Sequence, residues 1–236
     1  MKPVKGIIFD YGGTIDNAGD HWAVVIREAY ATLPIPELPL DLFCKGYVFA
    51  ERELARVRHI LPEHTFRDMM EIKAKLELEE LVRLGAPIDP SSIPDFASRI
   101  AIYTDERARA CVEAARPTLD YLCERYPMVL VSNFYGNIGS VLREYDLERY
   151  FRTVVESAVV GVRKPDPAIF KLGVDALGLE PEEVLVVGDS VGKDILPAQS
   201  LGCPTAWIGG RPWFFEEVKE APGQKIYSLS ELQKLY

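Results

Sequence analysis

The chain has 236 residues and a mass of 26.5 kDa, enough for one large domain or for a core domain that carries a smaller insertion. Hydrophobic residues make up 48% of it and charged residues 27%, so it is predicted to be a soluble globular protein, neither disordered nor fibrous. The formal net charge of −9 argues against nucleic acid as a partner, because neutralising phosphates requires a basic surface.

We find no targeting or membrane-spanning pattern in the sequence. The apolar stretch in MKPVKGIIFD is too short for the core of a signal peptide, and no other stretch approaches the length of a membrane helix. The cysteines are widely scattered and form no CxxC pair, which favours buried thiols in a reducing cytosol over zinc or disulfides. We therefore predict a cytoplasmic protein with no membrane partner.

The first half of the chain is predicted to be one strand followed by helices. Val4 to Phe9 form an apolar run typical of a strand. Asp20 suits the N-cap of the next helix, in which apolar residues recur at helical spacing as far as Leu33. Further helices are expected at about 40–61, 63–84 and 95–115, with Pro117 at the first position of another short helix.

After about residue 121 the pattern changes to alternating strands and helices. The continuous apolar runs 128–131 and 184–187 are typical of strands buried on both faces of a parallel sheet. Weaker strand signals are found at 153–155, 205–208 and 225–227. Helical patterns lie at about 137–145 and 166–177. This alternation predicts an α/β fold with a Rossmann-like parallel sheet, formed by 1–15 and 116–236 and interrupted by a helical domain at 16–115.

Polar residues that can carry chemistry follow four of the predicted strands. They are Asp10 with Gly12, Gly13 and Thr14; Ser132 and Asn133; Arg163 to Pro167; and Gly188 to Ser190 with Asp194. Each also has a structural explanation, as a helix N-cap, a turn residue or a solvated lysine. Because ligands bind at the carboxyl ends of strands in open parallel sheets, their joint placement favours a functional site.

These four segments resemble, in order, the motifs of the haloacid dehalogenase (HAD) superfamily. They read FDYGGT at 9–14, VSN at 131–133, RKPDP at 163–167 and VGDSVGKD at 187–194. The resemblance covers nearly the whole chain and is most specific at about 158–202. The helical insertion is similar to the C1-type cap of the family, which closes over the active site.

The resemblance implies a covalent mechanism that depends on Mg²⁺. Asp10 is expected to attack phosphorus and to carry an aspartyl-phosphate. The metal is expected to be held by Asp10, the main-chain carbonyl of Gly12 and Asp189. Asp194 is expected to act through a metal-bound water.

The remaining motif residues are expected to bind the transferring phosphoryl oxygens. The resemblance implies this role for Ser132, the Lys164 ammonium and backbone N–H groups around Gly13 and Asn133. The expected substrate is a small phosphorylated metabolite, and the expected reaction is hydrolysis of its phosphomonoester.

The sequence departs from the common phosphatase pattern at Gly12. Many relatives carry there a second aspartate, which protonates the leaving group. Three explanations compete: a phosphatase whose leaving group needs little protonation or receives its proton from Asp16, His21 or a cap residue; a dehalogenase-type enzyme; and a catalytically weak or silent binding protein. Dehalogenases carry an aromatic residue at this place and do not need the metal-binding pair Gly188-Asp189, so we favour the phosphatase.

The insertion is expected to choose the substrate. Its most basic cluster comprises Arg52, Arg56, Arg58 and His59. We interpret this cluster as a solvated helix face paired with Glu51 and Glu53 rather than as a binding site. No lysine of the insertion is singled out for the role that the phosphonatase branch of the family requires. Trp22 fits the apolar stripe of a helix and is expected to be a core residue.

Overall fold

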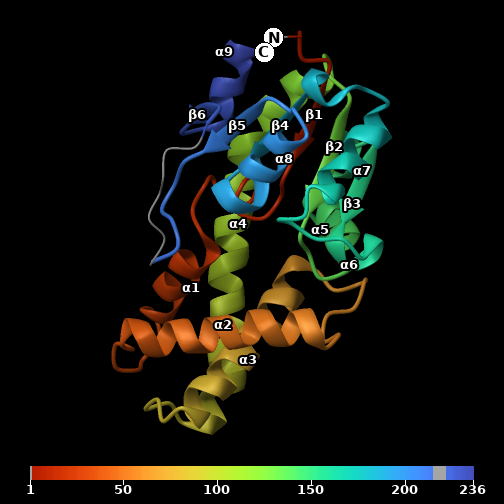
Figure 1. Ribbon diagram of the computed structural model, residues 1–236. Helices are drawn as coiled ribbons and strands as arrows, with labels where there is room; N and C mark the ends of the chain where they lie inside the picture. Colours follow the sequence, from red (N-terminus) through yellow and green to blue (C-terminus); the bar gives the residue numbers. More distant parts are fainter. Residues whose placement is uncertain (1, 215–221) are drawn as a thin grey trace.

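Figure 1 shows the computed structural model of the chain, which describes residues 2–214 and 222–236. The described residues form a six-stranded parallel sheet in the order β3-β2-β1-β4-β5-β6. Its strands are β1 (Gly6–Phe9), β2 (Met128–Ser132), β3 (Thr153–Glu156), β4 (Val184–Gly188), β5 (Thr205–Ile208) and β6 (Gln224–Ile226). The Rossmann-like α/β fold predicted from the sequence is confirmed.

The central strands are apolar throughout because both faces of the sheet are covered. Successive side chains of a strand point to opposite faces. Ile7 of β1 belongs to the larger core cluster, which extends into the inserted helices, whereas Ile8 belongs to a second cluster on the other face with Val129 and Val186. β1, β2 and β4 are buried along their whole length. These three strands therefore place their carboxyl ends rigidly in the middle of the sheet.

The inserted helices, by which we mean α1 to α3 and the N-terminal part of α4, lie at one end of the molecule (Figure 1). Their bounds are α1 (Trp22–Tyr30), α2 (Leu40–Arg56), α3 (Phe66–Arg83) and α4 (Ile93–Cys123). α3 packs against both α2 and α4. The N-cap predicted for α1 was wrong by one residue: the Nδ1 atom of His21 accepts from the N–H of Ala23, while Asp20 binds Arg107 and Arg211 instead.

α4 corrects a second prediction, since no separate helix begins at Pro117. α4 runs without interruption for 31 residues with Pro117 inside it. Proline removes one helical hydrogen bond and usually breaks a helix. Here Val112 before it, and Leu119 and Leu122 after it, are all buried, and their packing continues the helix past the proline. α4 thus connects the inserted helices directly to the sheet region (Figure 1).

The remaining helices are short and flank the sheet. They are α5 (Ile138–Glu144), α6 (Ser157–Val160), α7 (Ala168–Leu177), α8 (Leu196–Ser200) and α9 (Leu232–Leu235). A π-helical turn at Val191–Ile195 follows β4 and carries Asp194. Within the described ranges, no helix combines the length and the apolar character that crossing a bilayer requires.

Candidate active site

Asp10 is the first polar residue after β1, and its side chain is held by two donors. Its backbone N–H donates to the carbonyl of Val187, so the chain stays in register with β4 for one residue beyond the strand. Oδ1 accepts from Nζ of Lys164 at 2.5 Å, and Oδ2 accepts from Oγ1 of Thr14 at 3.1 Å. The carboxylate is only 5% exposed, and burial raises its pKa while Lys164 opposes that rise. Asp10 is thus fixed in one orientation at the sheet edge.

Lys164 is a buried ammonium shared by two carboxylates. Besides Asp10, its Nζ donates to Oδ1 of Asp194 at 2.6 Å. Burial by itself lowers the pKa of Lys164, but the two carboxylates outweigh it and raise that pKa. Asn133 holds the lysine backbone from both sides, because its Oδ1 accepts from the Lys164 N–H at 2.9 Å and its Nδ2 donates to the Lys164 carbonyl at 3.0 Å. The Asn133 side chain therefore positions Lys164.

Three carboxylates, two of them buried, meet beside this single ammonium. Asp10, Asp189 and Asp194 each place a carboxylate oxygen within 4.8 Å of the others. Burial, together with the charges of Asp10 and Asp194, raises the pKa of Asp189 well above its usual range. One ammonium does not balance three carboxylates, so the cluster lacks positive charge. Because Mg²⁺ prefers oxygen ligands, this donor set fits a magnesium ion.

A glycine permits the close approach of Asp189. Gly13 has a φ of +92°, and a Cβ at this position would lie 2.4 Å from Oδ2 of Asp189. Thr14, the next residue, extends its hydroxyl to within 3.1 Å of Asp10 Oδ2 and 3.4 Å of Asp189 Oδ1. The turn after β1 is therefore shaped around the acidic cluster.

Asp16 lines a cavity together with Asp10 and has an unusual environment. It is 1% exposed, and its Oδ1 accepts from the N–H of Gly13 at 2.7 Å and from Nε1 of Trp22 at 3.3 Å. Among the described residues, none hydrogen-bonds to its Oδ2. Burial, and to a lesser degree the charge of Asp10, raises the pKa of Asp16 well above its usual range, which favours a neutral carboxyl. A carboxyl whose raised pKa favours the neutral form therefore lines the same cavity as Gly12, where many relatives carry an aspartate.

His21 is a weaker candidate for an acid. Burial, with the charges of Lys193 and Lys73, lowers the pKa of His21 to about 4, so the imidazole is neutral at pH 7. Its Nδ1 is occupied by the N-cap hydrogen bond to Ala23. Trp22 was expected to be a core residue, but it is only partly buried and lines the cavity that contains Asp10.

This cavity has a volume of about 750 Å³, which is within the usual range for small-molecule sites. Every predicted site residue lines it: Asp10, Gly12, Ser132, Asn133, Lys164, Asp189 and Asp194. The opposite side of the cavity comes from the inserted helices and the loop after β2. The side chains there that sequence reasoning missed are those of Tyr47, Glu51, Lys73 and Tyr135.

The position of Lys73 in the sequence indicates a buried polar site. Phe66, Met69, Met70, Ala74 and Leu78 form the buried face of α3, and Lys73 and Glu77 occupy positions on that face. A charged residue on an apolar helix face is unusual and indicates a buried polar site. The structure therefore places a lysine of the insertion, Lys73, on the cavity that contains Asp10.

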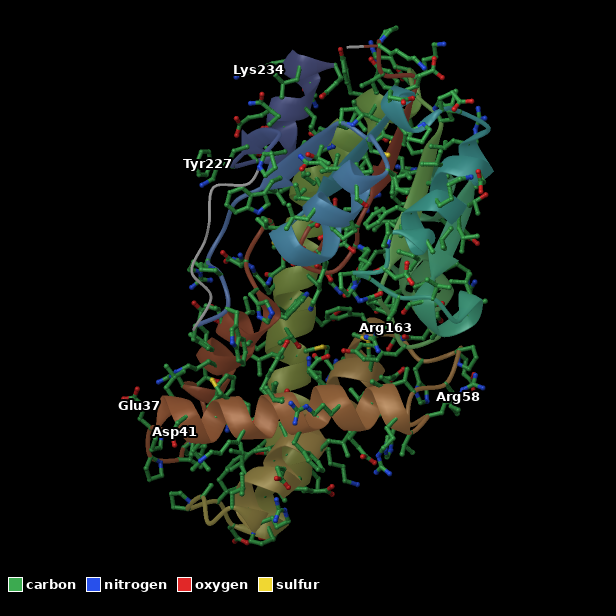
Figure 2. All side chains as sticks on the ribbon, in the orientation of Figure 1. Glu37, Asp41, Arg58, Arg163, Tyr227 and Lys234 are labelled. Carbon is green, nitrogen blue, oxygen red and sulfur yellow. The ribbon has the colours of Figure 1, made fainter. Side chains whose placement is uncertain are left out.

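The basic cluster of α2 lies outside this cavity. Arg56 and His59 both contact Glu53, at 2.6 Å and 3.3 Å. Arg56 and Arg58 line a neighbouring cavity, and Arg58 lies just past the end of α2 (Figure 2). Glu51 does not pair with these arginines as expected, because its carboxylate contacts Lys73 inside the site.

The fold and the site define a class of protein, and comparison with known sequences names it. Residues 4–202 match the haloacid dehalogenase-like hydrolases, and the chain belongs to this family. It is 40% identical to the glyceraldehyde 3-phosphate phosphatase of Methanocaldococcus jannaschii, over 97% of this chain and 95% of that protein. It is 43% identical to the phosphoglycolate phosphatase of Photorhabdus laumondii, over 86% and 80%. The chain is thus a HAD-like hydrolase with relatives named as phosphatases.

Other similarities are shorter or concern the fold alone. The chain spans between 12% and 34% of the length of three further curated relatives. Its fold is similar to that of the HAD-hydrolase YfnB from Bacillus subtilis bound to magnesium, with a TM-score of 0.63 and 21% identity over 99% of both chains. A dehalogenase crystal structure is similar to the same degree, with a TM-score of 0.65 and 20% identity over 100% of this chain and 98% of that one.

Proposed function

We propose that this protein is a Mg²⁺-dependent phosphatase that hydrolyses a small phosphomonoester through an aspartyl-phosphate on Asp10. The observation that carries the proposal is the fixed, buried Asp10 carboxylate beside one ammonium and two further carboxylates in a cavity of substrate size. The full-length similarity to two phosphatases of small phosphorylated metabolites supports it.

In the first step, an oxygen of Asp10 forms a bond to phosphorus while the bond to the leaving oxygen breaks. Lys164 keeps Asp10 oriented and offsets negative charge on the transferring group. Ser132 lines the cavity at the end of β2, where its hydroxyl can donate to a phosphoryl oxygen. In the second step, a water oxygen forms a bond to phosphorus while the bond between phosphorus and the Asp10 oxygen breaks, so phosphate is released and the Asp10 carboxylate is regenerated.

Magnesium would be held by Asp10, the carbonyl of Gly12 and Asp189, where it would neutralise charge between the nucleophile and the phosphoryl oxygens. The two oxygens of Asp194 accept from Nζ of Lys164 and from the N–H of Ser190. We assign it the part of orienting Lys164 and the outer ligands of the metal.

We assign the leaving-group proton to Asp16. Its carboxyl is buried, its Oδ2 has no partner among the described residues, and the same cavity contains Asp10. A neutral carboxyl can donate its proton to the departing alkoxide and then, as a carboxylate, accept a proton from the attacking water. This assignment explains how a chain with glycine at residue 12 retains acid–base help.

An aspartate at residue 12 is expected to take over the proton donation that we assign to Asp16. A Cβ built on Gly12 meets no atom within 4 Å, so a side chain has room at this position. In an Asp16→Asn background, Gly12→Asp should raise kcat on an alkyl phosphate at least about tenfold, because it restores an acid. Gly12→Asn is the matched control, since it has the same shape and no acidic proton. Equal rates for the two variants would contradict the assignment.

Removal of the metal tests the proposed reaction against its alternatives. Phosphate release from a panel of phosphorylated sugars and acyl phosphates should fall at least about 100-fold in EDTA and return with added Mg²⁺. Halide release from 2-haloacids without metal would instead support a dehalogenase, whose fold this chain shares. No turnover of either class would support a silent binding protein. Phosphate and halide assays on the same preparation distinguish the three outcomes.

A further inference from the structure

An ion pair with a buried lysine lies on the side of the cavity formed by the inserted helices. Lys73 of α3 is 4% exposed, and its ammonium contacts Oε1 of Glu51 on α2. The hydroxyl of Tyr135 donates to both oxygens of Glu51, at 3.3 Å and 3.2 Å. The ammonium also lies 4.4 Å from the ring centroid of Tyr47. All four residues line the cavity that contains Asp10.

We propose that Lys73 and Glu51 bind the leaving group and select phosphomonoesters with an uncharged, hydroxylated leaving group over those that carry a carboxylate. The proposal rests on the proposed function and extends it, because it names the substrate class. With phosphorus at Asp10, an ester group that fills this cavity extends toward the inserted helices, where this pair lies.

Hydrogen-bonding capacity favours a hydroxyl between these two groups. An ammonium has three donors, and Glu51 is the one acceptor of a Lys73 hydrogen bond among the residues that the structure describes. Glu51, as a carboxylate, has lone pairs beyond those that Lys73 and Tyr135 occupy. A hydroxyl can accept from Lys73 and donate to Glu51 at the same time. A carboxylate can only accept, so it would leave Glu51 without a donor.

The charges near the pair also oppose an anionic leaving group. A substrate carboxylate bound to Lys73 would lie close to the Glu51 carboxylate, and like charges at such short range repel each other. Glu77 lies on the same helix face with its Oε1 buried and without a partner among the described residues, but burial raises its pKa to about 7, so it adds less negative charge than Glu51. Lys193 also lines the cavity, but it is exposed, and solvent weakens its attraction for an anion.

Aromatic rings complete this end of the cavity. The His21 ring lies 6.0 Å from Tyr47 and 5.3 Å from Trp213, and Tyr47 lies 5.3 Å from Trp213, between ring centroids. These three rings and the ion pair form one surface with both apolar and polar parts. Such a surface suits a short carbon skeleton with hydroxyl groups.

The test compares kcat/KM for glyceraldehyde 3-phosphate, whose leaving group is uncharged, with that for phosphoglycolate, whose leaving group carries a carboxylate. The wild type should favour the first by at least about tenfold. Glu51→Gln should lower this preference at least about fivefold, because one negative charge beside Lys73 is removed. Lys73→Met should raise the preference, since the Glu51 carboxylate then faces a substrate carboxylate without the Lys73 cation between them.

Controls separate this proposal from a structural ion pair and from failure of the phosphatase proposal. Glu53→Gln, two residues along α2 and outside the cavity, should leave the preference unchanged. The melting temperature of each variant reports a merely structural role, which would lower stability without changing the preference. p-Nitrophenyl phosphate reports whether the phosphoryl site works at all: no hydrolysis of any of the three esters would refute the phosphatase itself.

The proposal is overturned if Glu51→Gln and Lys73→Met change the preference in the same direction or leave it unchanged while p-nitrophenyl phosphate is still hydrolysed. It is also overturned if the wild type prefers phosphoglycolate. Loss of that preference in Lys193→Met would then show that the exposed lysine, and not the pair of Lys73 and Glu51, recognises the leaving group.

Discussion

Replacing Asp10 by asparagine is expected to abolish phosphate release, with a fall in kcat of at least about 1,000-fold. A neutral amide oxygen is a poor nucleophile, and the variant also loses one carboxylate of the predicted metal site. Lys164 would keep Asp194 as its partner, so the fold should survive the change. Phosphate release at saturating Mg²⁺, measured beside the melting temperature, separates loss of chemistry from loss of folding.

The matched control for this variant is Asp41→Asn. Asp41 lies on α2 away from the cavity (Figure 2), and its side chain is 72% exposed in a long contact with Lys45. We expect its phosphate release to equal that of the wild type. Full activity of Asp10→Asn would exclude Asp10 as the nucleophile and with it the aspartyl-phosphate.

Asp16→Asn is expected to give the second largest effect, a fall in kcat of about 100- to 10,000-fold on alkyl phosphates. Asparagine keeps the shape of the side chain and the acceptor for the Gly13 N–H, but it has no acidic proton to give. The effect should depend on the leaving group: acyl and aryl phosphates, whose leaving groups need little protonation, should lose much less activity.

The diagnostic quantity is therefore the loss of kcat on alkyl phosphates divided by the loss of kcat on acyl and aryl phosphates. A series of esters with leaving groups of decreasing acidity should show a progressively larger defect in Asp16→Asn. The same defect on all of them would show that Asp16 only shapes the turn through its bond to Gly13. His21→Asn should show no such dependence on the acidity of the leaving group, because its imidazole is already neutral at pH 7.

Much of the sheet edge could be predicted from sequence because its determinants are local. Continuous apolar runs end at Phe9, Val131 and Val187, and the parallel topology brings the residues after them together. The structure places Asp10, Ser132 and Asp189 on one cavity, as this reasoning requires. The same local rules place most helix boundaries within a few residues.

Other features depend on tertiary packing and were beyond local rules. From the sequence alone, Pro117 is typical of the first position of a helix. α4 continues through it because Leu119 and Leu122 are buried, which only the structure shows. Asp16 was one of several candidates for an acid until its burial and its unpartnered oxygen distinguished it. Lys73 and Glu51 lie on different helices, and nothing local pairs them.

The most direct test of the whole account is a crystal grown with Mg²⁺ and a fluoride mimic of the phosphoryl group, such as beryllium trifluoride. We expect the mimic bonded to the Asp10 carboxylate, with Lys164 beside it and the metal held by Asp10, the Gly12 carbonyl and Asp189. A cavity that holds neither group under conditions that saturate the activity, or these side chains directed away from one another, would contradict the account.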